Sequence, residues 1–211
     1  MLTFLALLTP VLVLAWLLTS ISMRHLPFVG TGRGLLMVAI AVLLVQALGL
    51  IAHRLFLRAL PLRAGEISAG SRQEFIYQVY ILFYLILFNS MLRAQFIPIP
   101  LMRLVYLALG ARLGPNTYTS GIIFDPLFVT VGSNCMIGET TLLLPHVIEG
   151  ERLGHFPIHI GNNVTIGAHA IILAGVTIGD NVIVAANSVV AKHRILLRGE
   201  MWGGSPARRL R

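Results

Sequence analysis

Six side chains that can accept or donate protons lie close together in the second half of this chain. They are His146, Glu149, Glu151, His155, His159 and His169. A neutral imidazole can take up a proton near neutral pH and return it later, so His146 is a candidate general base. Glu149 or Glu151 could orient that imidazole, although carboxylates in exposed loops are more often simply solvated. The candidate catalytic residues are therefore His146 and Glu149.

A six-residue repeat defines the elements that must hold these side chains. Steps of six from Leu113 and again from Ile160 give twelve positions, ten of them aliphatic. They are Leu113, Thr119, Asp125, Val131, Ile137, Leu143, Ile160, Ile166, Ile172, Ile178, Val184 and Val190. No α-helix has this period, but short strands joined by tight turns do, with one side chain per strand pointing inward. The repeat predicts a parallel β-solenoid, with asparagines such as Asn134, Asn163 and Asn181 in left-handed turn positions.

The repeat breaks once, between Leu143 and Ile160, where the spacing is 17 residues. A break of this kind predicts a loop that leaves the coil, and such loops often carry function. We expect the excursion to run from about Glu149 to Leu153, with residues 154–159 forming one more hexad and Ile158 pointing inward. His146 then lies in the turn just before the loop, and His169 stacks about one coil away from it.

Three segments of the repeat resemble those of the hexapeptide-repeat acyltransferases. They are Ile160-Gly161-Asn162-Asn163-Val164-Thr165-Ile166-Gly167, Gly175-Val176-Thr177-Ile178-Gly179-Asp180-Asn181 and the closing Gly204-Ser205-Pro206-Ala207-Arg208. The resemblance covers about residues 111–211. It implies a left-handed parallel β-helix that assembles as a homotrimer and transfers an acetyl group from acetyl-CoA. It also implies that the histidine before the Ile-Gly run, His146 here, is the general base, without an acyl-enzyme.

The same resemblance indicates how the cosubstrate would bind. It implies that the pantetheine arm of CoA lies against small residues, which match Ala168, Ala186 and Ala191. The basic residues that would meet the CoA phosphates match Lys192, Arg208 and Arg211. We further expect His169 and Glu151 to contact the acceptor. The sequence departs from the family between His193 and Arg198, and Trp202 is expected to cap the solenoid.

A metal centre is the alternative interpretation of the histidines, because some hexapeptide-repeat proteins are zinc carbonic anhydrases. A zinc site needs converging ligands at about 2 Å. The closely spaced histidine pair of those enzymes has no counterpart here, since Ala168 and Leu173 occupy the corresponding places. We therefore expect no metal. Cys135, the lone cysteine, is expected to be a core thiol.

The first half of the chain has the composition of a membrane protein. Hydrophobic residues make up 56% of the sequence and charged residues 11%. Residues 1–112 carry nine Arg and two acids (+7), so most of the net charge of +8 lies there. These arginines are spaced between apolar runs, which argues against nucleic-acid binding. We expect residues 1–112 to form a membrane region and residues 113–211 the β-helix domain, with no nucleic-acid partner.

Two apolar runs, at about 2–22 and 35–51, are long enough for transmembrane helices, since about 20 apolar residues cross a bilayer. The first is expected to be retained, because it lacks the signs of a cleaved signal peptide. A third run, Phe75 to Leu92, contains Gln78, Asn89 and Ser90, and we expect it to be re-entrant, interfacial or packed within an oligomer. Beyond it, Pro98 and Pro100 should interrupt the helix in the segment Phe96 to Pro100 before a short helix ends near Gly110.

Arginine counts predict the orientation. The loop between the first two runs holds Arg24 and Arg33, whereas the next holds Arg54, Arg58, Arg63 and Arg72. The richer loop should be cytoplasmic. We therefore expect an inner-membrane protein with its catalytic domain facing the cytoplasm.

These observations together predict a membrane-anchored acyltransferase. Its acceptor would be a hydroxyl or amine of a membrane-associated glycan or lipid-linked molecule, so membrane lipid is an expected partner. The rival interpretation is a non-catalytic trimeric scaffold of envelope biosynthesis. A protein similar to the zinc carbonic anhydrases is a further alternative.

Overall fold

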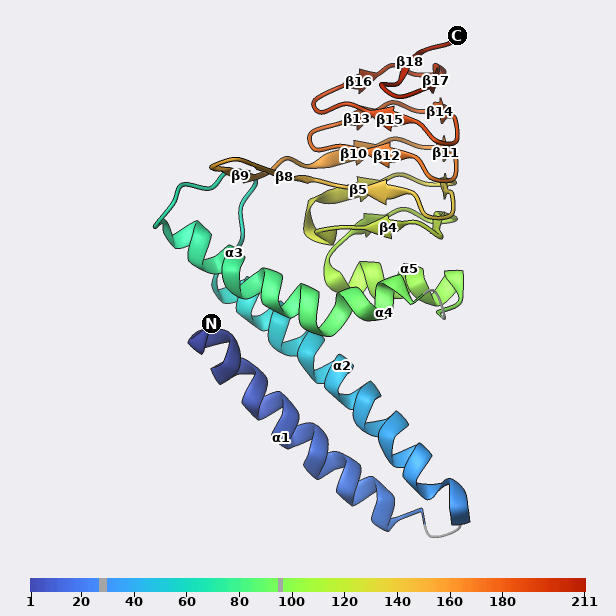
Figure 1. Cartoon of the computed structure of the whole chain (residues 1–211). Coiled ribbons are helices and arrows are strands. Elements are labelled where there is room, and N and C mark those ends of the chain that lie inside the picture. The colour runs from blue at the N-terminus through green and yellow to red at the C-terminus, as the bar shows by residue number, and fades with distance from the viewer. Residues whose placement is uncertain (27–29, 95–96) are drawn as a thin grey trace. The chain divides into compact units, whose positions relative to one another are not determined.

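A computed structural model describes residues 1–26, 30–94 and 97–211, and these residues form two compact units. The helical unit comprises Met1–Leu62 and Arg72–Met91, and the strand unit comprises Arg63–Ser71 and Leu92–Arg211. Figure 1 traces the chain through both units. The sequence suggested a boundary after residue 112, whereas the contacts place residues 63–71 and 92–112 with the strands.

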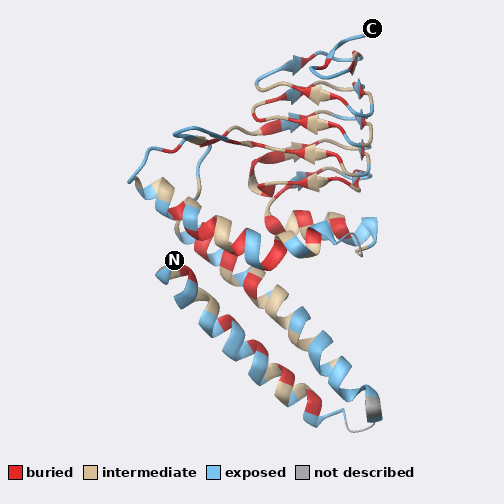
Figure 2. Ribbon diagram, in the orientation of Figure 1, coloured by how far each residue is buried: buried red, intermediate tan, exposed pale blue. Residues whose placement is uncertain are grey.

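The helical unit contains the three apolar runs as helices. They are α1 (Leu2–Arg24), α2 (Arg33–Ala59) after a 3₁₀ turn η1 (Gly30–Gly32), and a third helix made of α3 (Arg72–Phe83), the π-helical turn η2 (Tyr84–Phe88) and α4 (Asn89–Arg93). By length and composition, all three can cross a membrane. Only 6% of the most apolar window of α2 is buried, so its apolar side chains point outward (Figure 2). Within a single copy, Gln78 and Ser90 of the third helix are exposed.

The third helix ends before Pro98 and Pro100, where these prolines led us to expect an interruption. α4 ends at Arg93, and α5 (Ile99–Leu109) begins after Pro98, with Pro100 in its first turn. Phe96, part of the predicted interruption, lies outside the described residues. α5 ends at Gly110, whose φ of 115° is a left-handed conformation that glycine adopts readily.

Three parallel sheets make up most of the strand unit. Sheet 1 has the order β16-β13-β10-β5-β2, sheet 2 β17-β14-β11-β6-β3, and sheet 3 β15-β12-β7-β4. The bounds in sheet 1 are β2 Arg112–Leu113, β5 Val129–Val131, β10 Ile158–Ile160, β13 Thr177–Ile178 and β16 Ile195–Leu196. Those in sheet 2 are β3 Tyr118–Thr119, β6 Met136–Ile137, β11 Thr165–Ile166, β14 Ile183–Val184 and β17 Met201–Gly203, with β18 (Arg208–Arg209) antiparallel to β17. Those in sheet 3 are β4 Ile122–Ile123, β7 Leu142–Leu143, β12 Ile171–Ile172 and β15 Val189–Val190.

Each coil contributes one strand to each sheet in turn, as the six-residue repeat predicted. In sheet 1, Val131, Ile160 and Ile178 lie in register, and all three are buried. Figure 2 shows buried residues in successive layers of the stack. The turns hold Asn134, Asn163 and Asn181 at φ between 54° and 59°, which confirms the predicted left-handed positions. Cys135 is buried at 2% exposure, as expected for a core thiol.

The first coil departs from the even spacing of six. In sheet 3, Leu143 pairs with Ile123 rather than with Asp125, so the inward position comes two residues earlier than the repeat suggested. The backbone N–H of Ile123 donates to the hydroxyl of Tyr106, which fixes β4 there. Asp125 consequently leaves the strand, with φ at 43°, just before the 3₁₀ turn η3 (Pro126–Phe128).

The break in the repeat is a β-hairpin, and the extra hexad expected at 154–159 is absent. β8 (His146–Glu149) and β9 (Arg152–His155) pair antiparallel, and β9 also pairs with β1 (Gly65–Glu66). Residues 146–155 therefore leave the stack, a wider excursion than expected (Figure 1). Ile160 returns directly above Val131, and Ile158 is fully buried as predicted. Pairing with a strand 86 residues away, seen in the Arg152–Glu66 contact, stabilises the excursion.

Candidate active site

The hairpin β8–β9 places two histidines opposite each other at its base. His146 begins β8, His155 ends β9, and the two are direct cross-strand partners. His155 also pairs with Gly65 of β1, so β9 has a paired strand on each side. An ion pair between Arg152 and Glu66 adds a contact nearer the tip. The backbone around His146 is thus held by strand pairing rather than by a free loop.

His146 is hydrogen-bonded to a buried carboxylate. Its Nδ1 lies 2.5 Å from Oδ2 of Asp125, whose side chain is only 2% exposed. An ionised carboxylate can only accept, so Nδ1 donates the hydrogen and the Nε2 lone pair of the neutral ring stays available. Phe124 contacts the imidazole edge-on, with ring centroids 5.9 Å apart. This arrangement holds a histidine in the tautomer that a general base requires.

Asp125 has a second histidine on its other side. Nε2 of His155 lies 3.9 Å from Oδ1 of Asp125, and the His155 ring stacks on Phe128 at a centroid distance of 4.6 Å. Burial lowers the pKa of His155, against the smaller raising effect of the Asp125 charge. His155 therefore stays neutral near neutral pH, and the charge of Asp125 is left to act on His146.

His146 also lines a surface pocket of about 220 Å³. The other lining residues are Leu144, Val147, Ile148, Glu149, Leu173, Ala174 and Lys192. The ammonium of Lys192 donates to Glu149, and this hydrogen bond lowers the pKa of the Glu149 carboxyl. The pocket thus joins the candidate base to a carboxylate from the same strand, β8, and to a lysine from the coil that contains β15. Among the sequence-predicted residues, the structure brings together His146, Glu149 and Lys192.

The remaining histidines and Glu151 lie elsewhere. Glu151 is exposed in the two-residue turn at the hairpin tip, and His159 is exposed on β10. His169 does not stack on His146, because the absent hexad shifts its neighbours. Its Nδ1 lies 2.5 Å from the hydroxyl of Thr140, and its backbone N–H donates to Glu139.

The alanines predicted to border the pantetheine fall into two groups. Ala168 and Ala186 lie in successive coils at the corner between sheets 2 and 3, joined by the hydrogen bond from the Asn187 N–H to the Ala168 carbonyl. Ala191, by contrast, follows β15 beside Lys192, at the corner between sheets 3 and 1 that carries His146. One copy of the chain therefore presents the two groups at different corners.

The predicted basic ending is exposed. Arg208 lies in β18 and Arg211 is the last residue, and both are solvent-accessible. Trp202 lies in β17, in the last layer of sheet 2, and its indole N–H donates to Glu200 at 2.9 Å. That hydrogen bond is the main reason why the pKa of Glu200 is lowered. No group of three or more His, Cys, Asp or Glu side chains in the described part of the chain is placed to hold a metal ion.

Sequence reasoning missed Asp125 as a site residue, and it did not place His155 beside it. Asp125 was visible as one of two non-aliphatic residues at the twelve repeat positions, and it was the only charged one. A charge at a position expected to face the core is the signal that could have identified it. The shift of register in the first coil, which moves Asp125 to the corner beside His146, could not be read from the spacing.

The repeat is similar to sequences of known proteins. Residues 157–192 match the family described as bacterial transferase hexapeptide (six repeats). The chain is 39% identical over 99 residues to galactoside O-acetyltransferase of Escherichia coli K12, covering 42% of this chain and 49% of that protein. It is 34% identical over 101 residues to mitochondrial gamma carbonic anhydrase 2 of Arabidopsis thaliana, covering 39% and 36% respectively.

The chain is also similar in sequence to a protein of solved structure. The hexapeptide-repeat acetyltransferase VCA0836 of Vibrio cholerae, complexed with acetyl coenzyme A, is 33% identical with a TM-score of 0.44 and covers 48% of this chain and 60% of that one. The chain spans about half the length of the galactoside O-acetyltransferase that it matches. Residues 157–192 thus carry the hexapeptide repeat of bacterial transferases, and the homologues of this chain include acetyltransferases of the hexapeptide-repeat family.

Proposed function

We propose that this chain is a CoA-dependent O-acetyltransferase in which His146 is the general base and Asp125 orients it. The observation that carries the proposal is the 2.5 Å contact between His146 Nδ1 and Asp125 Oδ2 at the edge of an open pocket. The similarity to galactoside O-acetyltransferase supports the reaction class. Asp125 accepts the hydrogen bond from Nδ1 of His146, as an orienting carboxylate would. It therefore takes the role first considered for Glu149 and Glu151.

In the proposed reaction, one proton moves from the acceptor hydroxyl to His146 and then to the sulfur of CoA. Nε2 of His146 takes the proton from the acceptor hydroxyl as its oxygen attacks the thioester carbonyl of acetyl-CoA. The carbon–sulfur bond then breaks, and the CoA sulfur leaves with the proton that His146 returns. Asp125 stabilises the transient imidazolium. The residues of the site fit the cosubstrate, because Lys192 offers a cation to a phosphate and the small Ala174 leaves room beside it.

A homotrimer would complete this site. Ala168 and Ala186 lie at a different corner from His146, Ala191 and Lys192, so a cleft between copies could bring both sets to one pantetheine arm. On this proposal the stack is the left-handed β-helix of the resembling family. Arg208, Arg211, His169 and Glu151 keep their proposed roles, the first two toward CoA and the last two toward the acceptor.

The proposed acceptor is a hydroxyl or amine of a membrane-associated glycan or lipid-linked molecule. The three long apolar helices support a membrane location, and an anchor is most useful when the acceptor is also at the membrane. We propose the inner membrane, with the strand unit in the cytoplasm, where acetyl-CoA is made. Proteolysis of intact spheroplasts should then spare the strand unit, and ready digestion from outside would overturn this orientation.

The reaction is tested by incubating the purified chain with acetyl-CoA and candidate glycolipids and measuring the CoA released. His146→Ala should abolish release, whereas His159→Ala, which removes an exposed histidine from β10, should retain it. Equal loss in both variants would argue against His146 as the base. Absence of release from a trimer that is otherwise intact would favour the scaffold. Stoichiometric zinc in the purified protein would instead favour an enzyme similar to the carbonic anhydrases.

A further inference from the structure

The helix α5 is fixed to the first coil of the strand unit by buried polar contacts. The hydroxyl of Tyr106, fully buried, donates to the carbonyl of Gly121 at 3.2 Å and accepts from the N–H of Ile123 at 3.1 Å. The guanidinium of Arg103 donates to the carbonyls of Leu113 and Gly114, at 3.0 and 2.9 Å. These bonds define which side of α5 faces the coils.

The opposite side of α5 is apolar and exposed. Leu101 is 52% exposed and Leu104 is 57% exposed. Arg103 is the only charged residue of the helix, and its guanidinium is bound to the first coil. Helices of soluble domains usually place polar residues opposite the buried side. α5 instead has an apolar surface on both sides, which calls for a non-aqueous partner.

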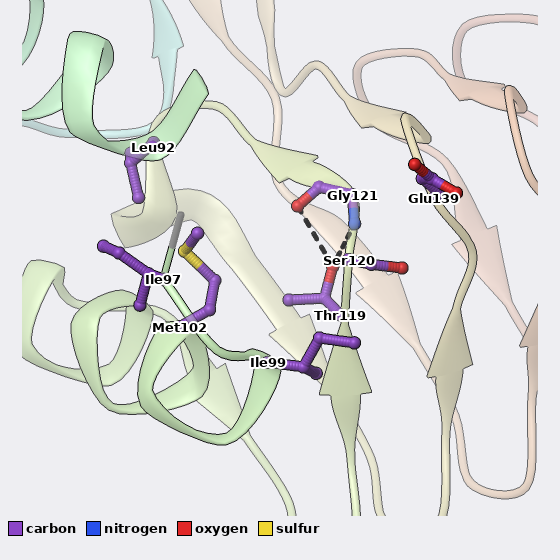
Figure 3. Close-up of a pocket in the computed structure, with 8 residues that line it drawn as sticks. All are labelled: Leu92, Ile97, Ile99, Met102, Thr119, Ser120, Gly121 and Glu139. Atoms are coloured by element: carbon purple, nitrogen blue, oxygen red, sulfur yellow. Dashed lines mark hydrogen bonds between the residues drawn. The ribbon is translucent and has the colours of Figure 1, made fainter. Parts of the chain in front are cut away.

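The apolar surface continues into a pocket beside the start of α5. This pocket has a volume of about 290 Å³, and Figure 3 shows its lining. One wall consists of Leu92, Ile97, Ile99 and Met102, and the other of Thr119, Ser120, Gly121 and Glu139. Ile99 lies on the same side of α5 as Arg103 and Tyr106, yet 44% of it is exposed at the mouth of this pocket. The pocket therefore has an apolar wall on the helix side and a polar wall on the coil side.

Charge and chain connectivity indicate what covers this surface. Residues 92–112 contain Arg93, Arg103 and Arg112 and no acidic residue; Arg112 is exposed, and the guanidinium of Arg93 lies 5.6 Å from the centroid of the Phe124 ring. Arg93 is the last residue of the third helix able to cross a membrane, and five residues separate it from Ile99. A linker this short reaches about 20 Å at most. An apolar helix flanked by arginines and connected to a long apolar helix matches the headgroup region of an anionic bilayer.

We propose that the exposed side of α5, with the adjoining pocket, is a lipid-contacting surface. In this arrangement α5 lies parallel to the membrane in the headgroup region, Leu101 and Leu104 reach the acyl chains, and Arg112 meets lipid phosphates. The base of the strand unit then rests on the bilayer. This proposal does not depend on acetyl transfer, and it stands or falls separately.

Spin labels can test the proposal on the full chain. Leu101→Cys and Leu104→Cys, made one at a time, are labelled and reconstituted in bilayers of phosphatidylglycerol and phosphatidylethanolamine. The matched control is Leu197→Cys, because Leu197 is an exposed leucine, at 61%, in the last coil of the stack. Cys135 is buried, so the unmodified chain should take up no label and provides the blank. The measurement is the accessibility of each label to oxygen and to a water-soluble nickel chelate.

Labels at 101 and 104 should favour oxygen over nickel, whereas the label at 197 should favour nickel. Nickel accessibility at 101 and 104 equal to that at 197 would show that α5 faces water and would overturn the proposal. Labels shielded from both reagents and coupled to each other between copies would show that a second copy covers α5. That result would overturn it as well.

Discussion

The imidazole of His146 is hydrogen-bonded to the carboxylate of Asp125, with 2.5 Å between Nδ1 and Oδ2. The two residues are 21 positions apart and meet because each closely follows a strand of sheet 3, Asp125 after β4 and His146 after β7. Asp125 is almost fully buried, whereas 27% of the His146 side chain is exposed. A buried anion that holds a partly exposed base is the arrangement expected of a proton-transfer site.

Substitution of each carboxylate by its amide should show whether Asp125 or Glu149 orients His146. Asp125→Asn should lower kcat by about 10²- to 10⁴-fold, because the amide can present its N–H to Nδ1 and favour the wrong tautomer. Glu149→Gln should lower kcat far less, since Glu149 is bonded to Lys192. Steady-state CoA release measures both. The opposite ranking would return the orienting role to Glu149.

Lys192→Gln should raise KM for acetyl-CoA and leave kcat nearly unchanged. The lysine lines the His146 pocket and offers a cation to a phosphate, an interaction that stabilises the ground state and the transition state alike. Arg198→Gln removes the same charge from an exposed site on the last coil and is the control. The comparison of KM at two salt concentrations provides the measurement. An unchanged KM in Lys192→Gln would contradict the assignment.

Acid should destabilise the strand unit through His155. Its pKa in the folded state is lowered by burial from the ordinary 6.5, so the unfolded state binds the proton more readily. The free energy of unfolding should therefore fall as the pH drops below about 6.5 and level off below the folded-state pKa. The rate at which a thiol reagent reaches buried Cys135 in detergent-solubilised protein reports the opening.

His155→Phe provides the matching variant for that experiment. A phenyl ring can keep the stacking on Phe128 without a proton to bind. The variant should lose much of the pH dependence between about 6.5 and the folded-state pKa. An identical pH profile for the two proteins would assign the acid sensitivity to other groups.

The close stacking of the coils should make Gly167 sensitive to substitution. A Cβ at this position would lie 2.4 Å from the backbone nitrogen of Ala186 in the next coil. Backbone atoms cannot move aside cheaply, so Gly167→Ala should destabilise the strand unit by about 1–3 kcal/mol or more. Gly34→Ala, whose Cβ would meet nothing within 4 Å, is the control. Thermal unfolding of both variants measures the difference, and equal melting temperatures would contradict the close packing.

The sequence predicted those features that depend on local burial. The six-residue period requires an inward apolar residue in every short strand, and the asparagines at left-handed turns follow from the same geometry. The apolar runs predicted the long helices, and Pro98 and Pro100 predicted the start of α5. His146 could be selected because it lies beside the one break in the period.

Tertiary structure decided which residues meet at that break. The hairpin β8–β9 is stabilised by β1, residues 65–66, which pairs with its second strand, β9, and no local sequence pattern indicates a partner so distant in the chain. The Tyr106 hydroxyl bonds to Ile123 of β4, and Ile123, two residues before the repeat position Asp125, pairs with Leu143. Asp125 therefore lies after the strand, where it can reach His146. The period of a repeat depends on what each strand must bury, whereas the register between coils depends on contacts that form only after the chain has folded back on itself.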